Sequence, residues 1–161
     1  MTYYKLLTVL SFSALLVVAG CASLLDPAVS QDGESAAKAG GAPIFVDSPR
    51  VFGPDSAGGY TVRYVFKNLT DEDFKYVRIG SSFRNRVGDR VSCRTGFRGA
   101  LRVTGPIEAG RSRSAQPQSK AYRCQVEKAV IETITITYMD DRTERFSRDE
   151  LLTMNAVLPD N

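Results

Sequence analysis

The sequence predicts an all-β chain that folds as a single antiparallel β-sandwich with one short C-terminal helix. Apolar residues recur at every second position in several windows, and clusters of turn residues separate those windows. Only one late segment carries the start signal of a helix. About 120 residues follow position 42, which is enough for one modest core and too few for two domains.

The N-terminal segment predicts export. Residues 1–20 have a basic start at Lys5 and an apolar run over 6–18, which is too short and too interrupted by hydroxyl side chains to span a membrane. Two small residues then precede Cys21, and this pattern resembles the lipobox of bacterial lipoproteins. The resemblance implies a signal peptide over 1–20 and lipidation of Cys21. Because Ala22 is not aspartate, it also implies an anchor in the outer membrane. The domain is expected to face the periplasm. A secretory signal with a coincidental cysteine, or an uncleaved anchor helix, is the alternative.

Residues 21–42 follow the signal and predict a lipidated cysteine with a flexible tether. The segment is rich in Ala, Gly, Ser and Asp and shows no apolar periodicity. Such a composition buries too little apolar area to offset the entropy of ordering. The folded domain is therefore expected over residues 43–161.

Two long strands are predicted in the first half of this domain. Apolar side chains alternate with polar ones over 60–67, and residues 68–73 supply a turn. A second alternating strand covers 77–84, and its polar face is basic. Shorter strands are predicted over 91–95, 100–104 and 121–126, with Gly105-Pro106 ending the middle one.

The strongest strand signal lies over residues 130–139. Ile134, Ile136 and Tyr138 fall on one face and three threonines on the other. Asp140-Asp141 predicts a hairpin turn into a strand over 142–146, although the usual turn glycine is missing. The strand is followed by Ser147 and, three residues later, Glu150. This spacing has the form of a capping box and predicts a helix over 148–154.

Cys93 and Cys124 predict one structural disulfide. Export places them in an oxidising compartment, and strand parity puts both thiols on inward faces. The alternatives are a redox pair or a metal site. The two cysteines lie outside any Cys-x-x-Cys spacing, and the chain has no histidine to complete a zinc site.

The absence of histidine also closes most enzymatic routes. No Ser-His-Asp or Cys-His nucleophile can be built, so only carboxylate chemistry is left. Each candidate carboxylate has a plainer explanation as a turn residue that bonds to local backbone. The candidates are Asp89, Glu108, Asp140, Asp141 and Glu144.

Charge is distributed unevenly and is the one pattern with functional content. Nine arginines lie between positions 78 and 113, against two acidic residues. Parity places Arg78, Arg84, Arg94 and Arg102 opposite the apolar positions of their strands, where they form a candidate anion-binding face. The alternative is that exposed strands need charge to prevent edge pairing, and that the acidic stretch over 140–150 pairs with these arginines.

Four segments resemble small envelope domains related in pattern to the FxLYD-like domains of bacterial lipoproteins. They are Lys75–Ile79, Asn85–Val91, Thr104–Ile107 with Gly110, and Ile134–Asp140. The resemblance covers about residues 60–146. It implies an immunoglobulin-like sandwich with a non-enzymatic role, and it identifies no ligand, cofactor or catalytic residue.

The leading functional hypothesis is therefore a non-catalytic envelope lipoprotein that binds a protein partner or assists assembly. Its rival is a module that binds anionic glycan or lipid through the arginine face, and a carboxylate hydrolase is a distant third. The membrane is expected as a partner through the lipid anchor. No cofactor and no metal are expected, and export argues against nucleic acid as a partner.

Overall fold

The strongest alternating pattern of the sequence forms the centre of one sheet. The computed structural model describes residues 27–94 and 99–159, and in it β4 pairs antiparallel with β8 over nearly its whole length. Ile134, Ile136 and Tyr138 are buried, whereas the threonines between them are half-buried. The strands of this five-stranded sheet are β4 (Phe74–Arg84), β5 (Arg90–Val91), β6 (Ala100–Ile107), β8 (Lys128–Tyr138) and β9 (Thr143–Ser147).

A smaller antiparallel sheet is built around the second alternating pattern. Its central strand presents Val62, Tyr64 and Phe66 to the interior, where all three are buried. One edge of this strand pairs with β7, and the other pairs with β1 and then β2. The strands are β1 (Ile44–Val46), β2 (Arg50–Phe52), β3 (Thr61–Asn68) and β7 (Ser112–Ala115).

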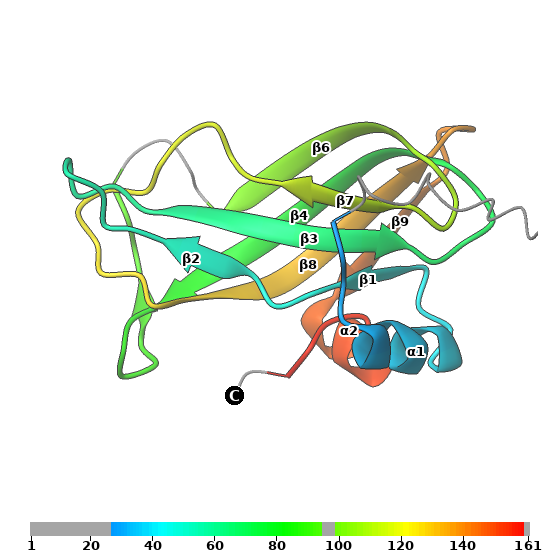
Figure 1. Cartoon of the computed structure of the whole chain (residues 1–161), viewed down its shortest axis with the longest axis horizontal. Coiled ribbons are helices and arrows are strands. Elements are labelled where there is room, and N and C mark those ends of the chain that lie inside the picture. The colour runs from blue at the N-terminus through cyan, green and yellow to red at the C-terminus, as the bar shows by residue number, and fades with distance from the viewer. Residues whose placement is uncertain (1–26, 95–98, 160–161) are drawn as a thin grey trace, which may run out of the picture.

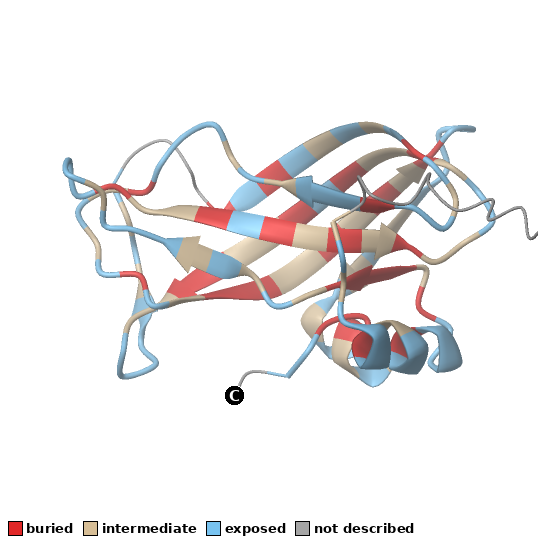
Figure 2. Cartoon of the chain, viewed as in Figure 1, coloured by how far each residue is buried: buried red, intermediate tan, exposed pale blue. Residues whose placement is uncertain are grey.

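The two sheets pack face to face and enclose one core (Figure 1). Buried residues recur along the strands of both sheets and lie between them (Figure 2). Tyr64 and Phe66 meet the inner residues Ile79, Ile134 and Ile136 in this core. The predicted antiparallel β-sandwich with a short C-terminal helix is confirmed.

Three predicted strand details are wrong. The strand predicted over 91–95 shortens to β5, which covers only Arg90–Val91. Residues 121–126 form no strand, because only Ala121 and Tyr122 make isolated bridges. Gly105-Pro106 does not end its strand, since β6 continues to Ile107. Proline is tolerated there because β6 pairs with β4 on one side only. The short strands β1, β2 and β7 carry too few residues to show an alternating pattern, and the sequence did not indicate them.

The predicted hairpin and capping box are present. Asp141 takes a left-handed conformation, with φ 68°, and so fills the turn position that glycine usually holds. Helix α2 (Arg148–Thr153) follows its N-cap residue Ser147, whose backbone N–H donates to the Glu150 carboxylate at 2.7 Å. Hydrogen bonds from the Ser147 side chain and backbone lower the pKa of Glu150.

The prediction of a flexible tether over 21–42 is wrong for its second half, which forms helix α1 (Gln31–Ala39). Small residues allow the close approach: Gly33 and Ala37 are buried against the core, and a Cβ on Gly33 would overlap the Phe45 ring. Glu34 also accepts from Lys38 and Lys67, at 2.8 Å each, and these hydrogen bonds lower its pKa. The composition resembles a linker, but its small residues are spaced to form a packing stripe.

Gly33→Ala is expected to lower the free energy of unfolding by about 2 kcal/mol, although alanine favours helices by about 1 kcal/mol. The added methyl group must displace Phe45, which is fully buried. Ser35→Ala, on the exposed face of α1, is the control and is expected to change stability by less than about 0.5 kcal/mol. Urea denaturation of both variants checks this. A Gly33→Ala variant as stable as the parent would show that α1 does not dock on the sandwich.

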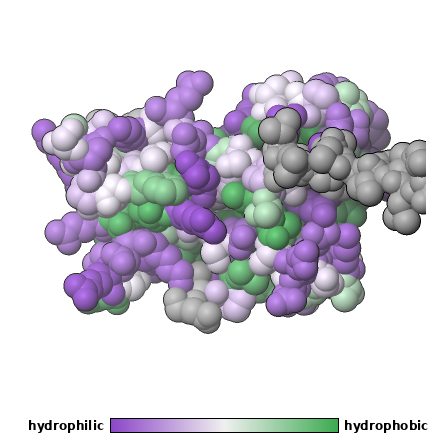
Figure 3. Space-filling view, viewed as in Figure 1, coloured by the Kyte–Doolittle hydropathy of each residue, from purple (hydrophilic) through white to green (hydrophobic). Residues whose placement is uncertain are grey.

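Within residues 27–94 and 99–159, no helix has the length and apolar character that crossing a membrane requires. The face of the molecule that carries β3 is largely hydrophilic, with apolar side chains in small separated patches (Figure 3).

Candidate functional site

The lipidation site predicted at Cys21 lies outside the described residues, and so do the signal peptide and the start of the tether. The predicted anchor and localisation therefore remain predictions.

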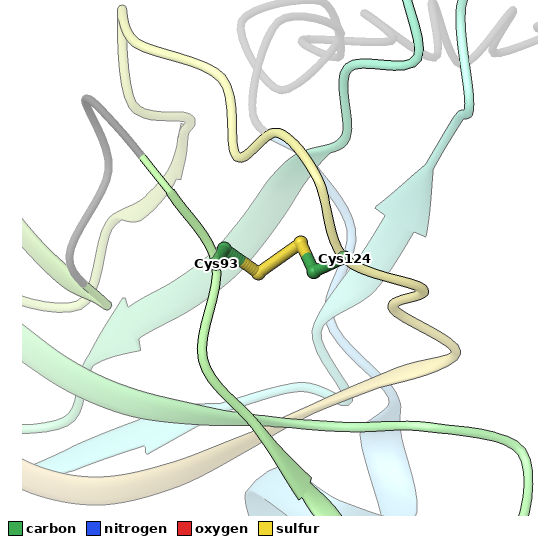
Figure 4. Close-up of a disulfide and its surroundings, with 2 residues drawn as sticks. All are labelled: Cys93 and Cys124. Carbon is green, nitrogen blue, oxygen red and sulfur yellow. A yellow bond between two sulfur atoms is a disulfide. The ribbon is translucent and has the colours of Figure 1, made fainter.

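The predicted disulfide between Cys93 and Cys124 is present. It joins the segment after β5 to the segment before β8, with a Cα–Cα distance of 5.0 Å (Figure 4). Both cysteines are half-buried and pack against the core. Backbone hydrogen bonds reinforce the junction, since Ala121 exchanges two with Tyr60 of the small sheet, and Tyr122 exchanges two with Arg94. The disulfide thus closes one end of the sandwich where the two sheets meet.

Strand register brings three arginines into one line across the outer face of the five-stranded sheet. Arg78 on β4 lies directly opposite Arg102 on β6 and, on its other side, opposite Thr135 on β8. Thr135 in turn lies opposite Arg145 on β9. All three arginines are exposed. Since paired strands lie about 4.8 Å apart, this arginine row is about 15 Å long.

Aromatic contact fixes one end of the arginine row. The Arg102 guanidinium lies 4.0 Å from the centroid of the Tyr76 ring, a cation–π distance. Among the described residues, no carboxylate lies within ion-pair distance of Arg78, Arg102 or Arg145.

The acidic stretch over 140–150 engages other partners. Arg142 pairs with Glu72 and Glu144, and Lys75 pairs with Asp141. The Arg142 guanidinium also lies 3.9 Å from the centroid of the Tyr138 ring. Burial and a hydrogen bond to Glu144 raise the pKa of Tyr138 to about 12. The alternative in which this stretch neutralises the arginine row finds no support among the described contacts.

Of the four predicted anion-binding residues, the structure brings only Arg78 and Arg102 together. Arg84 belongs to a second basic row at the other end of β4, where it lies opposite both Arg90 and Lys128. Arg94 lies apart from both rows, because it pairs with Tyr122 beside the disulfide.

Arg145 was missed because it stands in an acidic stretch. The sequence could have predicted its outward position, because Arg145 is next to the apolar Phe146. Side chains of neighbouring residues on a strand point to opposite faces of the sheet.

The candidate carboxylates lie in turns and ion pairs. Asn85 organises the turn that contains Asp89, accepting from the backbone N–H of Val87 and of Asp89. Asp140 accepts from the backbone N–H of Arg142 at 3.0 Å. Across 27–94 and 99–159, no three His, Cys, Asp or Glu side chains are grouped closely enough to hold a metal ion.

No protein-family model matches this chain, and neither a curated protein nor a solved structure matches it significantly. A function must therefore be argued from the chain's own geometry.

Proposed function

We propose that this chain is a lipid-anchored, non-catalytic binding module of the bacterial envelope, and that its five-stranded sheet holds an anionic glycan. The observation that carries this proposal is the arginine row, in which Arg78, Arg102 and Arg145 are exposed and share one line across four strands. The planar guanidinium group binds carboxylate and phosphate oxygens with two parallel hydrogen bonds.

A bound anion would neutralise like charges within the row. Arg78 and Arg102 lie directly opposite each other, and like charges in that position destabilise a sheet. An anion bound between them would remove this repulsion. Thr135 adds a hydroxyl between the second pair of guanidinium groups.

The second basic row favours an extended ligand. Arg84 follows Arg78 by six residues on β4, so about 20 Å separates the two rows. Gly80 lies between the rows, opposite Ala100 and Thr133, and Ser147 lies opposite Thr133. The strip also holds one carboxylate, Glu132, which accepts a hydrogen bond from Ser82 Oγ. Positive charge at both ends of this strip suits a linear polymer that carries anionic groups at intervals.

A glycan fits this face better than a membrane does. The exposed large apolar side chains among the described residues are Phe52, Val87, Met139 and Leu158, and none belongs to either basic row. A membrane-binding face is expected to add apolar side chains that enter the lipid. The sequence alone favoured a protein partner; the register of the arginines supports the anionic ligand instead.

The docking of α1 would hold the domain near the proposed anchor. If Cys21 carries the lipid, nine residues separate it from Gln31, the first residue of α1. A fully extended segment of that length reaches about 30 Å. The glycan would therefore be one that lies close to the membrane surface.

The test is the affinity of the full chain, in detergent micelles, for polygalacturonate. Arg78→Ser with Arg102→Ser is expected to weaken binding about 30-fold at low salt, because each exposed ion pair contributes about 1 kcal/mol. Raising the salt concentration should reduce this difference. Fluorescence anisotropy of a labelled polymer measures both effects.

Arg50 and Arg63 provide a matched control on the small sheet. They also lie directly opposite each other, and Arg63 stacks on Phe52 as Arg102 stacks on Tyr76. Arg50→Ser with Arg63→Ser removes the same charge and is expected to leave the affinity within about twofold. Equal losses in the two double variants would refute the arginine row as the site. Tighter binding to phosphatidylglycerol vesicles or to polyglutamate would replace the glycan with a lipid or a protein.

A further inference from the structure

A hollow of about 670 Å³ lies beside the disulfide, within the size range of small-ligand sites. Tyr60, Tyr122, Arg94 and Arg123 contribute to its wall, together with Pro54, Ala57 and Gly58. In Figure 1 the loops at this end of the sandwich lie on the left, away from α1 and α2. We call this hollow the cystine pocket, because Cys124 is part of its wall.

Two glycines lie close to the tyrosine rings of the cystine pocket. A Cβ on Gly59 would lie 2.8 Å from Cε1 of Tyr122, and a Cβ on Gly53 would lie 3.1 Å from Cδ1 of Tyr60. Each ring therefore packs close to backbone at a position where a side chain would meet it.

Each of the two chain segments that the disulfide joins carries an arginine next to its cysteine. Arg94 follows Cys93, and Arg123 precedes Cys124. Arg123 has φ 55°, a left-handed conformation that non-glycine residues adopt at an energetic cost. Residues held in such conformations cluster at binding sites.

Asp55, which lies between the pocket residues Pro54 and Ala57, already has hydrogen-bond partners. Asp55 accepts from the backbone N–H groups of Ala57 and Gly59 and from Lys120 Nζ. These hydrogen bonds, led by that of Lys120, lower the pKa of Asp55 to about 2. The described residues that line the pocket include two arginines and no acidic side chain.

We propose that the cystine pocket binds a single acidic sugar unit, a pyranose that carries a carboxylate or phosphate group. The tyrosine rings contact the apolar face of the sugar, and Arg123 binds its anionic group. This inference rests on the proposed anionic-glycan function but uses residues separate from both basic rows. Oxidised cysteines are required, because the disulfide fixes the segment that carries Arg123.

The test is an NMR titration of the full chain in detergent micelles with glucuronic acid and with glucose. Glucuronic acid is expected to shift the resonances of Tyr60 and Tyr122, and glucose to bind at least tenfold more weakly. Arg123→Gly is expected to weaken glucuronic acid binding about tenfold. Glycine suits a positive φ, so this variant keeps the local backbone while it removes the guanidinium group.

Two further variants keep the outcomes distinct. Tyr122→Leu is expected to weaken glucuronic acid binding as well, whereas Arg50→Ser with Arg63→Ser should leave it unchanged. Equal affinity for glucose and glucuronic acid, or unchanged affinity in a folded Arg123→Gly variant, would overturn the inference. In the parent protein, binding of glucuronic acid without binding of polygalacturonate would refute the proposed glycan function, and binding of polygalacturonate without binding of glucuronic acid would refute the cystine pocket.

Discussion

Replacing both Cys93 and Cys124 with serine is expected to lower the free energy of unfolding by about 4 kcal/mol. The bond joins residues 31 positions apart, and it limits the conformations open to the unfolded chain. Domains of this size are stable by roughly 5–15 kcal/mol, so the loss is a large share of the total. The backbone pairing of Tyr122 with Arg94 depends on the same junction and should weaken with it.

Urea denaturation measures this loss, and reduction supplies the control. The parent protein treated with dithiothreitol should unfold at the same urea concentration as the double serine variant, since both lack the bond. The variant should not respond to dithiothreitol. A difference of less than about 1 kcal/mol between the oxidised parent and the variant would contradict a stabilising disulfide.

Ile136→Ala is expected to destabilise the protein by about 4 kcal/mol. Ile136 is fully buried on β8, opposite Val77 on β4. Removing three carbon atoms there leaves a cavity between two close-packed sheets, which cannot collapse far because strand pairing holds both. Ile136→Val removes one carbon atom and should cost about 1 kcal/mol.

Thr135→Ala is the matched control, because it lies on the same strand and faces outward. Its expected cost is below about 1 kcal/mol, the span of strand propensity. Urea denaturation of the three variants gives the order of stability. Equal costs for Ile136→Ala and Thr135→Ala would show that β8 does not present alternate residues to the core.

The alternation of apolar and polar residues predicted the sandwich, because one face of each long strand is buried and the other is not. Tyr64 on β3 and Ile134 on β8 were both placed correctly from the pattern. The pattern does not reveal a strand that is too short to show alternating residues, such as β1, whose three residues are all buried. It also fails at Gly33, where the absence of a side chain is the packing signal.

The site could be predicted only in part, since parity gives the face of a strand but not its register. Arg78 and Arg102 were placed on an outward face, yet nothing in the sequence pairs them directly. Arg145 completes the row through a strand 43 positions later than Arg102. Arg94 was predicted on the same face because a strand was predicted over 91–95. In the structure Arg94 instead pairs with Tyr122 beside the disulfide.

Photo-crosslinking in intact cells tests the central claim most directly. A photoreactive residue at Thr135 stands within the arginine row and keeps all three arginines, and one at Val65 occupies the outer face of β3 as the control. Glycan adducts from Thr135 and none from Val65 are the predicted result. A discrete protein adduct from Thr135, or equal glycan adducts from both positions, would contradict a glycan-binding face on the five-stranded sheet.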